Sequence, residues 1–263
     1  MKRKARMLLA DARPNYGRID FEGLPNTRDL GGLPGADGAR VRRGLLLRSG
    51  TLYFATRADC ERLQEDYHLR AVVDLRGEDE LVEYPDGMER LPGVRYVHAD
   101  ALKGTVAGIS QNAEARAQLE AARDNDDDPA SFMEMVYPHI LLGESGIAAY
   151  RALLRCVLET TDGAVLWHCH FGRDRCGMAS LLVESVLGVP EASMEKDYLA
   201  TNRFNPDPAD ERTDANPRFI RAAVAAVTRE FGGVMGYVHE ALGITDAEVA
   251  ELRARYLEPA ARP

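Results

Sequence analysis

The chain has few cysteines, no long apolar run and no excess of basic residues, and each absence removes a class of protein. Four cysteines in 263 residues, without paired zinc-type spacing, exclude a disulfide scaffold and a zinc knuckle. No stretch approaches a membrane-spanning length, and the basic start MKRKARMLLADARP carries too short an apolar region for a signal peptide. We therefore expect a cytoplasmic protein without stable membrane insertion, with secretion by a signal-less route left open.

The charge balance of the chain is acidic. Its formal net charge is −9 and its pI is about 5.3, whereas a nucleic-acid-binding protein typically carries a basic surface. We therefore expect no nucleic-acid partner. A small anionic substrate remains compatible with this balance, because a local site can be positive on a negative protein.

Segments with strand and helix patterns alternate at first, and helices alone follow. Strands are expected at residues 19–22, 44–48, 69–75, 94–98 and 164–167, and helices at 56–67, 129–142, 146–159, 178–188, 191–201, 216–230, 233–242 and 246–256. This order predicts an α/β fold with a central, mostly parallel sheet flanked by helices and a helical C-terminal portion. We expect residues 1–17 to be an N-terminal extension and 18–263 a single domain, in which 101–128 form an insertion or loop near the functional site.

One loop, from Cys169 to Arg175, lies between an apolar strand and an apolar helix. A loop in that position can aim successive backbone N–H groups inward and use the helix N-terminus as a positive end, so it suits a phosphate. Gly172 permits a backbone turn that a side chain would obstruct. Arg175 can grip two phosphate oxygens bidentately.

The same loop holds a nucleophile and an acid. A thiol near a helix N-terminus and arginines loses its proton easily, so Cys169 is expected to react as a thiolate. Asp174 supplies a carboxylic acid that can protonate a leaving oxygen and later deprotonate a water. These parts predict phosphate-ester hydrolysis.

The loop sequence HCHFGRDRCG resembles the signature of the protein-tyrosine-phosphatase superfamily. More narrowly, it is similar to a bacterial branch of tyrosine and lipid phosphatases, atypical dual-specificity-like enzymes whose loop reads HCxxGKDR(T/S)G. Further similar elements are residues 26–32 (NTRDLGG), 47–50 (LRSG), 74–76 (DLR) with Glu80 and Pro85, 197–202 (DYLATN) and 231–257. The likeness runs from about residue 19 to residue 256, so it implies a cysteine-phosphatase fold and a phosphatase domain over nearly the whole chain.

The resemblance implies a role for each part of the loop. Cys169 would be the nucleophile, Asp174 the acid and base, and Arg175 the phosphate grip. The other residues of the phosphate-binding loop would be His170, Phe171, Gly172 and Arg173. Supporting residues would be His168, Cys176, Asp74 and Arg28. The family's chemistry needs no cofactor and no metal.

For the supporting residues, the sequence leaves alternative roles open. His168 is expected to support the loop rather than shuttle a proton. Asp74 either faces the site, at the end of its strand, or forms a structural ion pair with Arg76. Arg28 either braces the loop or contacts substrate.

Two positions depart from the family pattern. Arg173 replaces the usual Lys and is bulkier and planar. Cys176 replaces the usual Ser or Thr, whose hydroxyl attends the cysteine, and a thiol is a weaker donor, so phosphoenzyme breakdown is expected to be slowed. We also hypothesise a reversible disulfide between Cys169 and Cys176 that protects the nucleophile.

The predicted function is hydrolysis of phosphate monoesters through a cysteinyl-phosphate, with phosphotyrosine in proteins or dual specificity preferred. Phosphoinositides and small phosphometabolites are alternative substrates, and a catalytically weak phosphate-binding module is a further alternative. A sulfur transferase of the rhodanese kind usually has a loop one residue shorter, and a thiol oxidoreductase would require Cys-x-x-Cys, which is absent here.

Overall fold

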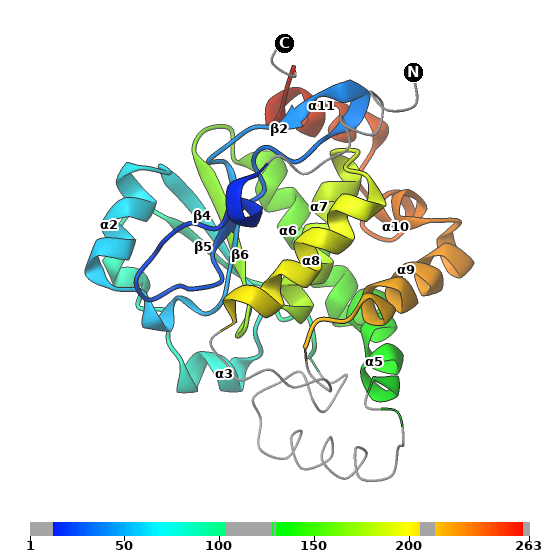
Figure 1. Cartoon of the computed structure of the whole chain (residues 1–263), viewed down its shortest axis with the longest axis horizontal. Helices are drawn as coiled ribbons and strands as arrows, with labels where there is room; N and C mark the ends of the chain where they lie inside the picture. Colours follow the sequence, from blue (N-terminus) through cyan, green and yellow to red (C-terminus); the bar gives the residue numbers. More distant parts are fainter. Residues whose placement is uncertain (1–12, 104–127, 129, 206–213, 260–263) are drawn as a thin grey trace.

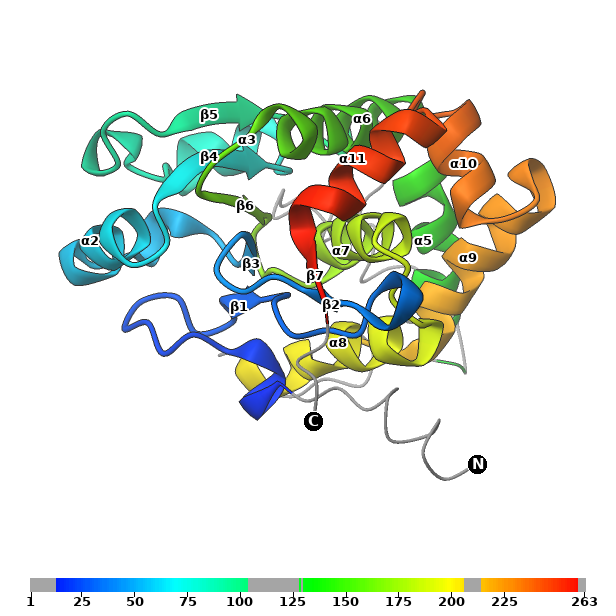
Figure 2. The ribbon, with the colours of Figure 1, turned by 90° about the horizontal axis from the view of Figure 1, so that it is seen from above.

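A five-stranded sheet forms the centre of the molecule, in a computed structural model that describes residues 13–103, 128, 130–205 and 214–259. The strand order is β1-β3-β6-β4-β5; Figure 1 labels β4, β5 and β6, and Figure 2 labels all five strands. The strands are β1 (Arg28–Asp29), β3 (Leu46–Ser49), β6 (Ala164–His168), β4 (Leu69–Asp74) and β5 (Arg95–His98). All run parallel except β1, which pairs antiparallel with β3. The predicted mostly parallel sheet is therefore confirmed.

Each face of the sheet has its own apolar core, because successive side chains of a strand point to opposite faces. On one face, Val73 and Trp167 belong to a large cluster shared with α6 and α7. On the other face, Val72 and Leu166 pack with α2. Figure 2 shows α2 on one side of the sheet and α7 on the other. These helices are α2 (Arg57–Glu65), α6 (Glu144–Glu159) and α7 (Asp174–Val186).

The strand expected at residues 19–22 does not form. The carboxylate of Asp59 accepts a hydrogen bond from the backbone N–H of Gly23 at 2.8 Å, which holds the chain in a turn. Ile19 and Phe21 are buried in the same cluster as α2. The segment therefore pairs with the sheet edge at its start alone, where Arg18 forms an isolated antiparallel bridge with Arg28, and then covers one face of the sheet.

Helix α7 lies at the centre of the helical half of the molecule. All of its residues except Ser185 are buried, as is typical of a helix that is covered all round. It contacts α5, α6, α8, α10 and α11, and α9 packs on α5 and α10. The other helices of this half are α5 (Ser131–Leu142), α8 (Glu191–Phe204), α9 (Pro217–Phe231), α10 (Val234–Glu240) and α11 (Asp246–Tyr256). The predicted helical C-terminal portion is confirmed.

Short elements complete the described part of the chain. Strands β2 (Arg40–Val41) and β7 (Leu257–Glu258) pair antiparallel, α3 is Glu78–Glu83, and 3-10 turns are η1 (Pro14–Gly17), η2 (Ala36–Gly38), η3 (Leu52–Phe54) and η4 (Met88–Arg90). Residues 1–12 and 104–127, most of the expected extension and insertion, lie outside the described residues. None of the helices in the described ranges combines the length and apolar character needed to span a bilayer.

A buried carboxylate, Asp197 of α8, gathers three arginines from the first 50 residues of the chain. Its Oδ1 lies 3.1 Å from Nη2 of Arg13 and 3.1 Å from Nη1 of Arg28, and its Oδ2 lies 2.6 Å from Nη1 of Arg48. None of these side chains is more than 1% exposed. Burial alone would raise the pKa of Asp197, but the three arginines outweigh it and hold the pKa well below its usual range.

Replacing Asp197→Asn is expected to destabilise the fold by about 3–5 kcal/mol, because three buried guanidinium groups lose their counter-ion. The difference from wild type should shrink as the pH falls. A carboxyl group with a lowered folded pKa stabilises the fold above its unfolded pKa, and this contribution is lost in acid. Urea unfolding at neutral and acidic pH measures both effects.

The matched control for this measurement is Asp162→Asn, which breaks an exposed pair with Arg70 whose side chains are 71% and 52% exposed. It is expected to cost no more than about 1 kcal/mol. Equal losses in the two variants would contradict the role of the Asp197 cluster.

Candidate active site

The loop that joins β6 to α7 turns its carbonyl groups toward donors outside the loop. Three consecutive carbonyl oxygens accept such hydrogen bonds: that of His170 from Thr51 N (2.9 Å), that of Phe171 from Asn26 Nδ2 (2.9 Å) and that of Gly172 from Arg48 Nη2 (2.7 Å). In a trans peptide the N–H points away from the carbonyl of the same unit. The N–H groups of the loop therefore face the opposite side, in the arrangement that binds anions.

Gly172 has the backbone conformation and the space that only glycine tolerates. Its φ is +69°, and an added Cβ would lie 2.7 Å from the carbonyl carbon of Ser49 and 2.8 Å from the backbone nitrogen of Gly50. The absence of a side chain thus lets the end of β3 lie directly against the loop. The loop is shorter than expected, because α7 already begins at Asp174.

Cys169 is the first residue after β6 and is only 2% exposed. Burial alone would raise the pKa of its thiol. Hydrogen bonds from the side chain and backbone of Cys176, together with the positive charge of Arg175, outweigh burial and lower the pKa to about 6. The sulfur is therefore mainly a thiolate at neutral pH, which is the reactive form.

Cys176 lies in the first turn of α7 and remains protonated. Burial, the hydrogen bond to Cys169 and the negative charge of Cys169 raise its pKa well above the usual value. Neither cysteine forms a disulfide in the structure, and Sγ of Cys176 also lies 3.5 Å from the carbonyl oxygen of Ser49. The single S–H proton of Cys176 thus has two acceptors within reach, the sulfur of Cys169 and this carbonyl oxygen, at the position where the family usually has a hydroxyl. The reversible disulfide between the two cysteines stays a prediction.

Arg175 is held by a carboxylate, Glu80 of α3. Its Nη1 and Nη2 donate to the two carboxylate oxygens of Glu80 at 2.5 and 2.9 Å, and both side chains are 1% exposed. The pKa of Glu80 is lowered, because Arg175 outweighs the effect of burial. This bidentate pair fixes the plane of the guanidinium group beside Cys169.

Asp174, the first residue of α7, accepts hydrogen bonds from two neighbours. Tyr137 of α5 donates its hydroxyl to Oδ1 at 2.5 Å, and Arg173 Nε lies 3.1 and 3.2 Å from the two carboxylate oxygens. The Tyr137 hydroxyl also shares a hydrogen bond with that of Tyr198, at 2.5 Å. The guanidinium carbon of Arg173 lies 5.4 Å from the ring centre of Phe171. Arg173 is 7% exposed and is therefore directed into the protein.

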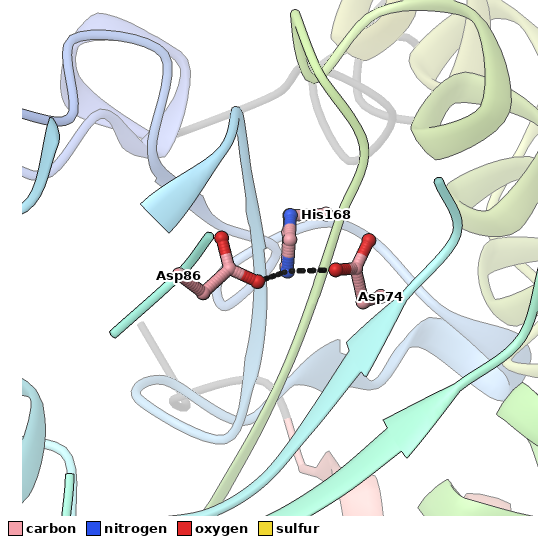
Figure 3. A group of neighbouring side chains, drawn as sticks. All are labelled: Asp74, Asp86 and His168. Carbon is pink, nitrogen blue, oxygen red and sulfur yellow. Dashed lines mark ion pairs between the residues drawn. The ribbon is translucent and has the colours of Figure 1, made fainter. Parts of the chain in front are cut away.

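His168 ends β6 and sits between two buried carboxylates, Asp74 and Asp86 (Figure 3). Its Nε2 lies 3.1 Å from Oδ2 of Asp86 and 3.7 Å from Oδ2 of Asp74. Burial would lower the pKa of His168, but the two carboxylates outweigh it and raise the pKa. The imidazole is thus favoured in its charged form, beneath the loop.

These three residues are also the group of side chains, within the described ranges, that could in principle hold a metal ion. However, Nη2 of Arg76 already lies 2.6 Å from Oδ2 of Asp74 and 2.8 Å from Oδ2 of Asp86. The oxygens that a cation would need are therefore occupied by a guanidinium group. The cluster does not fit a metal and is an ion-pair network, in which Asp74 and Arg76 pair as one of the two sequence readings proposed.

The remaining sequence-predicted residue, Arg28, lies apart from the loop's interior. It is fully buried, and its Nη atoms donate to Asp197 and Thr201 of α8.

Sequence reasoning did not assign Glu80 or Tyr137 to the site. Glu80 could have been noticed in the sequence as an acidic residue three positions after Gly77, at the start of a helix. A side chain at that position commonly accepts a hydrogen bond from the backbone N–H at the helix start, as Glu80 does from Gly77. Tyr137 carries no such signal, being 37 residues from Asp174.

Ultraviolet absorbance of the Cys169 thiolate is expected to rise through a transition near pH 6 in the wild-type protein. Cys176→Ala should move this transition to higher pH, because the thiolate loses a hydrogen-bond donor. Cys169→Ser should abolish it. As a control, Cys156→Ala should leave it in place, since burial raises the pKa of that thiol in α6. A wild-type transition near the ordinary thiol value of 9 would contradict the assignment.

Comparison with known proteins agrees with the geometry of this loop. A protein of Cupriavidus necator, described by its name as a candidate tyrosine-protein phosphatase, is 32% identical over 262 residues that cover 92% of this chain and 89% of the relative. A tyrosine-protein phosphatase of Nostoc commune is 28% identical over 128 residues, covering 40% of this chain and 43% of that one. Among solved structures, P. aeruginosa TpbA, a cysteine-to-serine variant in complex with phosphotyrosine, matches with a TM-score of 0.32 and 17% identity over 82% of this chain and 88% of its own. The model of the tyrosine phosphatase family matches residues 19–258, and the chain therefore belongs to the tyrosine phosphatase family.

Proposed function

We propose that the chain hydrolyses phosphotyrosine in proteins through a cysteinyl-phosphate intermediate. The observation that carries this proposal is the thiol of Cys169, whose pKa is about 6 although it is buried, in a loop whose carbonyl groups bond to outside donors, so that its N–H groups face the opposite side in an arrangement that suits an anion. A thiolate in that setting can attack phosphorus while the loop and Arg175 stabilise the negative charge of the phosphoryl oxygens.

In the first step, the thiolate of Cys169 forms a bond to phosphorus and the bond to the leaving oxygen breaks. Asp174, as a carboxylic acid, gives its proton to that oxygen. Oδ1 of Asp174 lies against both the Tyr137 hydroxyl and Arg173 Nε, whereas Oδ2 lies against Arg173 Nε alone, so we assign this proton to Oδ2.

In the second step, water attacks the cysteinyl-phosphate. The Asp174 carboxylate takes a proton from this water, the sulfur–phosphorus bond breaks, and Cys169 leaves as a thiolate. The thiol of Cys176 supports the departure by donating a hydrogen bond to the leaving sulfur. Atoms and charge then balance as one ester and one water giving one alcohol and one inorganic phosphate.

The preference for phosphotyrosine over a phosphoinositide rests on Arg173. A polyphosphorylated headgroup needs further cations beside the loop, but the guanidinium of Arg173 faces Asp174 and Phe171 and is 7% exposed. Both relatives named above carry tyrosine phosphatase names, which supports the same preference.

A phosphatase panel run in EDTA tests the chemistry. Cys169→Ser is expected to abolish turnover of p-nitrophenyl phosphate, phosphotyrosine and phosphoserine peptides, phosphoinositides and sugar phosphates alike. Asp174→Asn should slow phosphotyrosine peptides by about 10²–10⁴-fold, the usual contribution of a general acid, and slow p-nitrophenyl phosphate less, because its leaving group needs little protonation. Turnover that survives Cys169→Ser, or that requires a metal, would overturn the proposed mechanism. A panel in which phosphoinositides outperform phosphotyrosine would overturn the substrate assignment.

Tyr137→Phe is expected to lower kcat severalfold on phosphotyrosine peptides without abolishing activity and with little change in KM. The hydroxyl of Tyr137 donates to Oδ1 of Asp174, so removing it takes away a contact that holds the proposed acid in position. The loss should be smaller on p-nitrophenyl phosphate, because its leaving group needs little protonation. Tyr256→Phe is the matched control, because it also removes a buried hydroxyl, one that donates to the backbone of Val157 away from the site. Equal kcat values for the Tyr137 variant and wild type on phosphotyrosine peptides would contradict this positioning role.

A further inference from the structure

Five aromatic rings form a continuous row from the catalytic loop to the protein surface. The ring centres lie 4.7 Å apart for Phe171 and His170, 4.7 Å for His170 and Tyr84, and 5.4 Å for Tyr84 and Tyr53. Phe54 completes the row, 5.0 Å from Tyr53. Each of these four contacts is edge-to-face, the geometry that aromatic pairs prefer.

The topology of the sheet explains why these rings meet. Tyr53 follows β3, Tyr84 follows β4 through α3, and His170 follows β6. These three strands are parallel neighbours, so the segments after their carboxyl ends gather at one edge of the sheet. The row therefore belongs to the same edge as Cys169.

The outer end of the row is exposed, whereas its inner end, at Phe171 and His170, is partly buried. The side chain of His170 is 9% exposed, but Tyr53 is 43% and Phe54 is 55% exposed. In the described part of the chain the other exposed large apolar side chains are Val82, Tyr96 and Met135, and none of them is an immediate sequence neighbour of another. The pair at 53–54 is thus a local apolar patch that continues directly from the site.

The backbone beneath the patch is held in place on both sides. The carboxylate of Asp86 accepts from Leu52 N at 3.0 Å, and Thr51 Oγ1 accepts from Tyr53 N at 3.2 Å. Nη2 of Arg90 donates to the carbonyl oxygen of Leu52 at 3.3 Å. The rings of Tyr53 and Phe54 are therefore presented by a fixed turn, so little backbone ordering opposes contact with a partner.

The patch formed by Tyr53 and Phe54 lies too far along the row to contact a phosphoryl group bound in the loop. Tyr53 is two ring contacts away from His170, which neighbours Cys169. A residue of an extended peptide advances the chain by about 3.3–3.6 Å, so side chains one to three positions from a phosphorylated residue reach that distance. The patch therefore fits a flanking side chain of a peptide.

The charge nearby indicates which side chain fits. Helix α3, which ends directly before Tyr84, carries four acidic residues among its six: Glu78, Asp79, Glu80 and Glu83. Lys103 pairs with Glu78 and Arg175 with Glu80, so the segment keeps a net negative charge. Acidic flanks and anionic lipid headgroups would be repelled by such a segment. An apolar side chain would instead remove aromatic surface from water.

We propose that Tyr53 and Phe54 form a subsite for an apolar side chain that flanks the phosphotyrosine of a peptide substrate. The proposal rests on the proposed phosphotyrosine phosphatase function. It adds a sequence preference to that function: apolar flanking residues are preferred over acidic ones.

The test uses phosphotyrosine peptides that differ only in having Leu or Glu at each of the three positions on either side, with p-nitrophenyl phosphate as a reference substrate without flanks. Wild type is expected to prefer Leu at one or more positions by about tenfold in kcat/KM. Tyr53→Ala and Phe54→Ala should each reduce this preference severalfold, through a higher KM for the Leu peptide at nearly constant kcat. Val82→Ala, which removes an 84% exposed apolar side chain of α3, should retain the preference.

Three outcomes would overturn the subsite. One is an equal rate for Leu and Glu peptides with wild type. Another is a wild-type preference that both aromatic variants keep. The third is that Tyr53→Ala and Phe54→Ala reduce kcat/KM on p-nitrophenyl phosphate as much as on the Leu peptide. The aromatic pair would then support the structure of the active site rather than bind a flanking side chain. An enzyme that hydrolyses none of these substrates would instead refute the proposed function, so the two failures are distinguishable.

Discussion

The ion-pair cluster around Asp197 is the interaction on which the arrangement of the site depends. Arg13, Arg28 and Arg48 come from separate segments of the N-terminal part, and each is fixed by the same carboxylate of α8. Arg48 uses its other terminal nitrogen to hold the carbonyl of Gly172. Because a buried unpaired guanidinium is strongly unfavourable, the N-terminal segments, α8 and the loop can adopt this geometry only together.

Buried arginines around the loop likewise lie against carboxylates, although Arg48 shares Asp197 with Arg13 and Arg28. Arg175 pairs with Glu80, Arg76 with Asp74, and Arg48 with Asp197. These pairs neutralise most of the buried charge, so the charge that acts on the thiol of Cys169 is local. The low pKa of a buried cysteine follows from one guanidinium and two hydrogen bonds rather than from a general excess of positive charge. This explains how a protein with a net charge of −9 can build an anion site.

The sequence predicted the sheet and the location of the loop well, because both depend on local patterns. An apolar run read as a parallel strand, followed by Cys169, a glycine and an apolar helix, is visible within about 25 residues. The partners of the loop were not predictable from such patterns. Glu80 lies 95 residues before Arg175, and only the fold brings them together. The strand expected at residues 19–22 failed for the same reason, since the turn that replaces it depends on the distant Asp59.

Cys176 illustrates how a departure from the family pattern can be accommodated. A thiol is a weaker donor than a hydroxyl, which on its own argues for slower release of phosphate from the proposed intermediate. Burial and the neighbouring sulfur raise the pKa of Cys176, so its S–H remains available as a donor to the Cys169 thiolate. The backbone N–H of Cys176 adds a second donor that does not depend on the side chain at all. The side chain of Cys176 is the largest favourable contribution to the Cys169 thiolate, ahead of Arg175 and the backbone N–H of Cys176. Under the proposed mechanism, the residue at position 176 therefore controls how fast the sulfur leaves, while Arg175 and the backbone N–H would still stabilise it in a variant without that side chain.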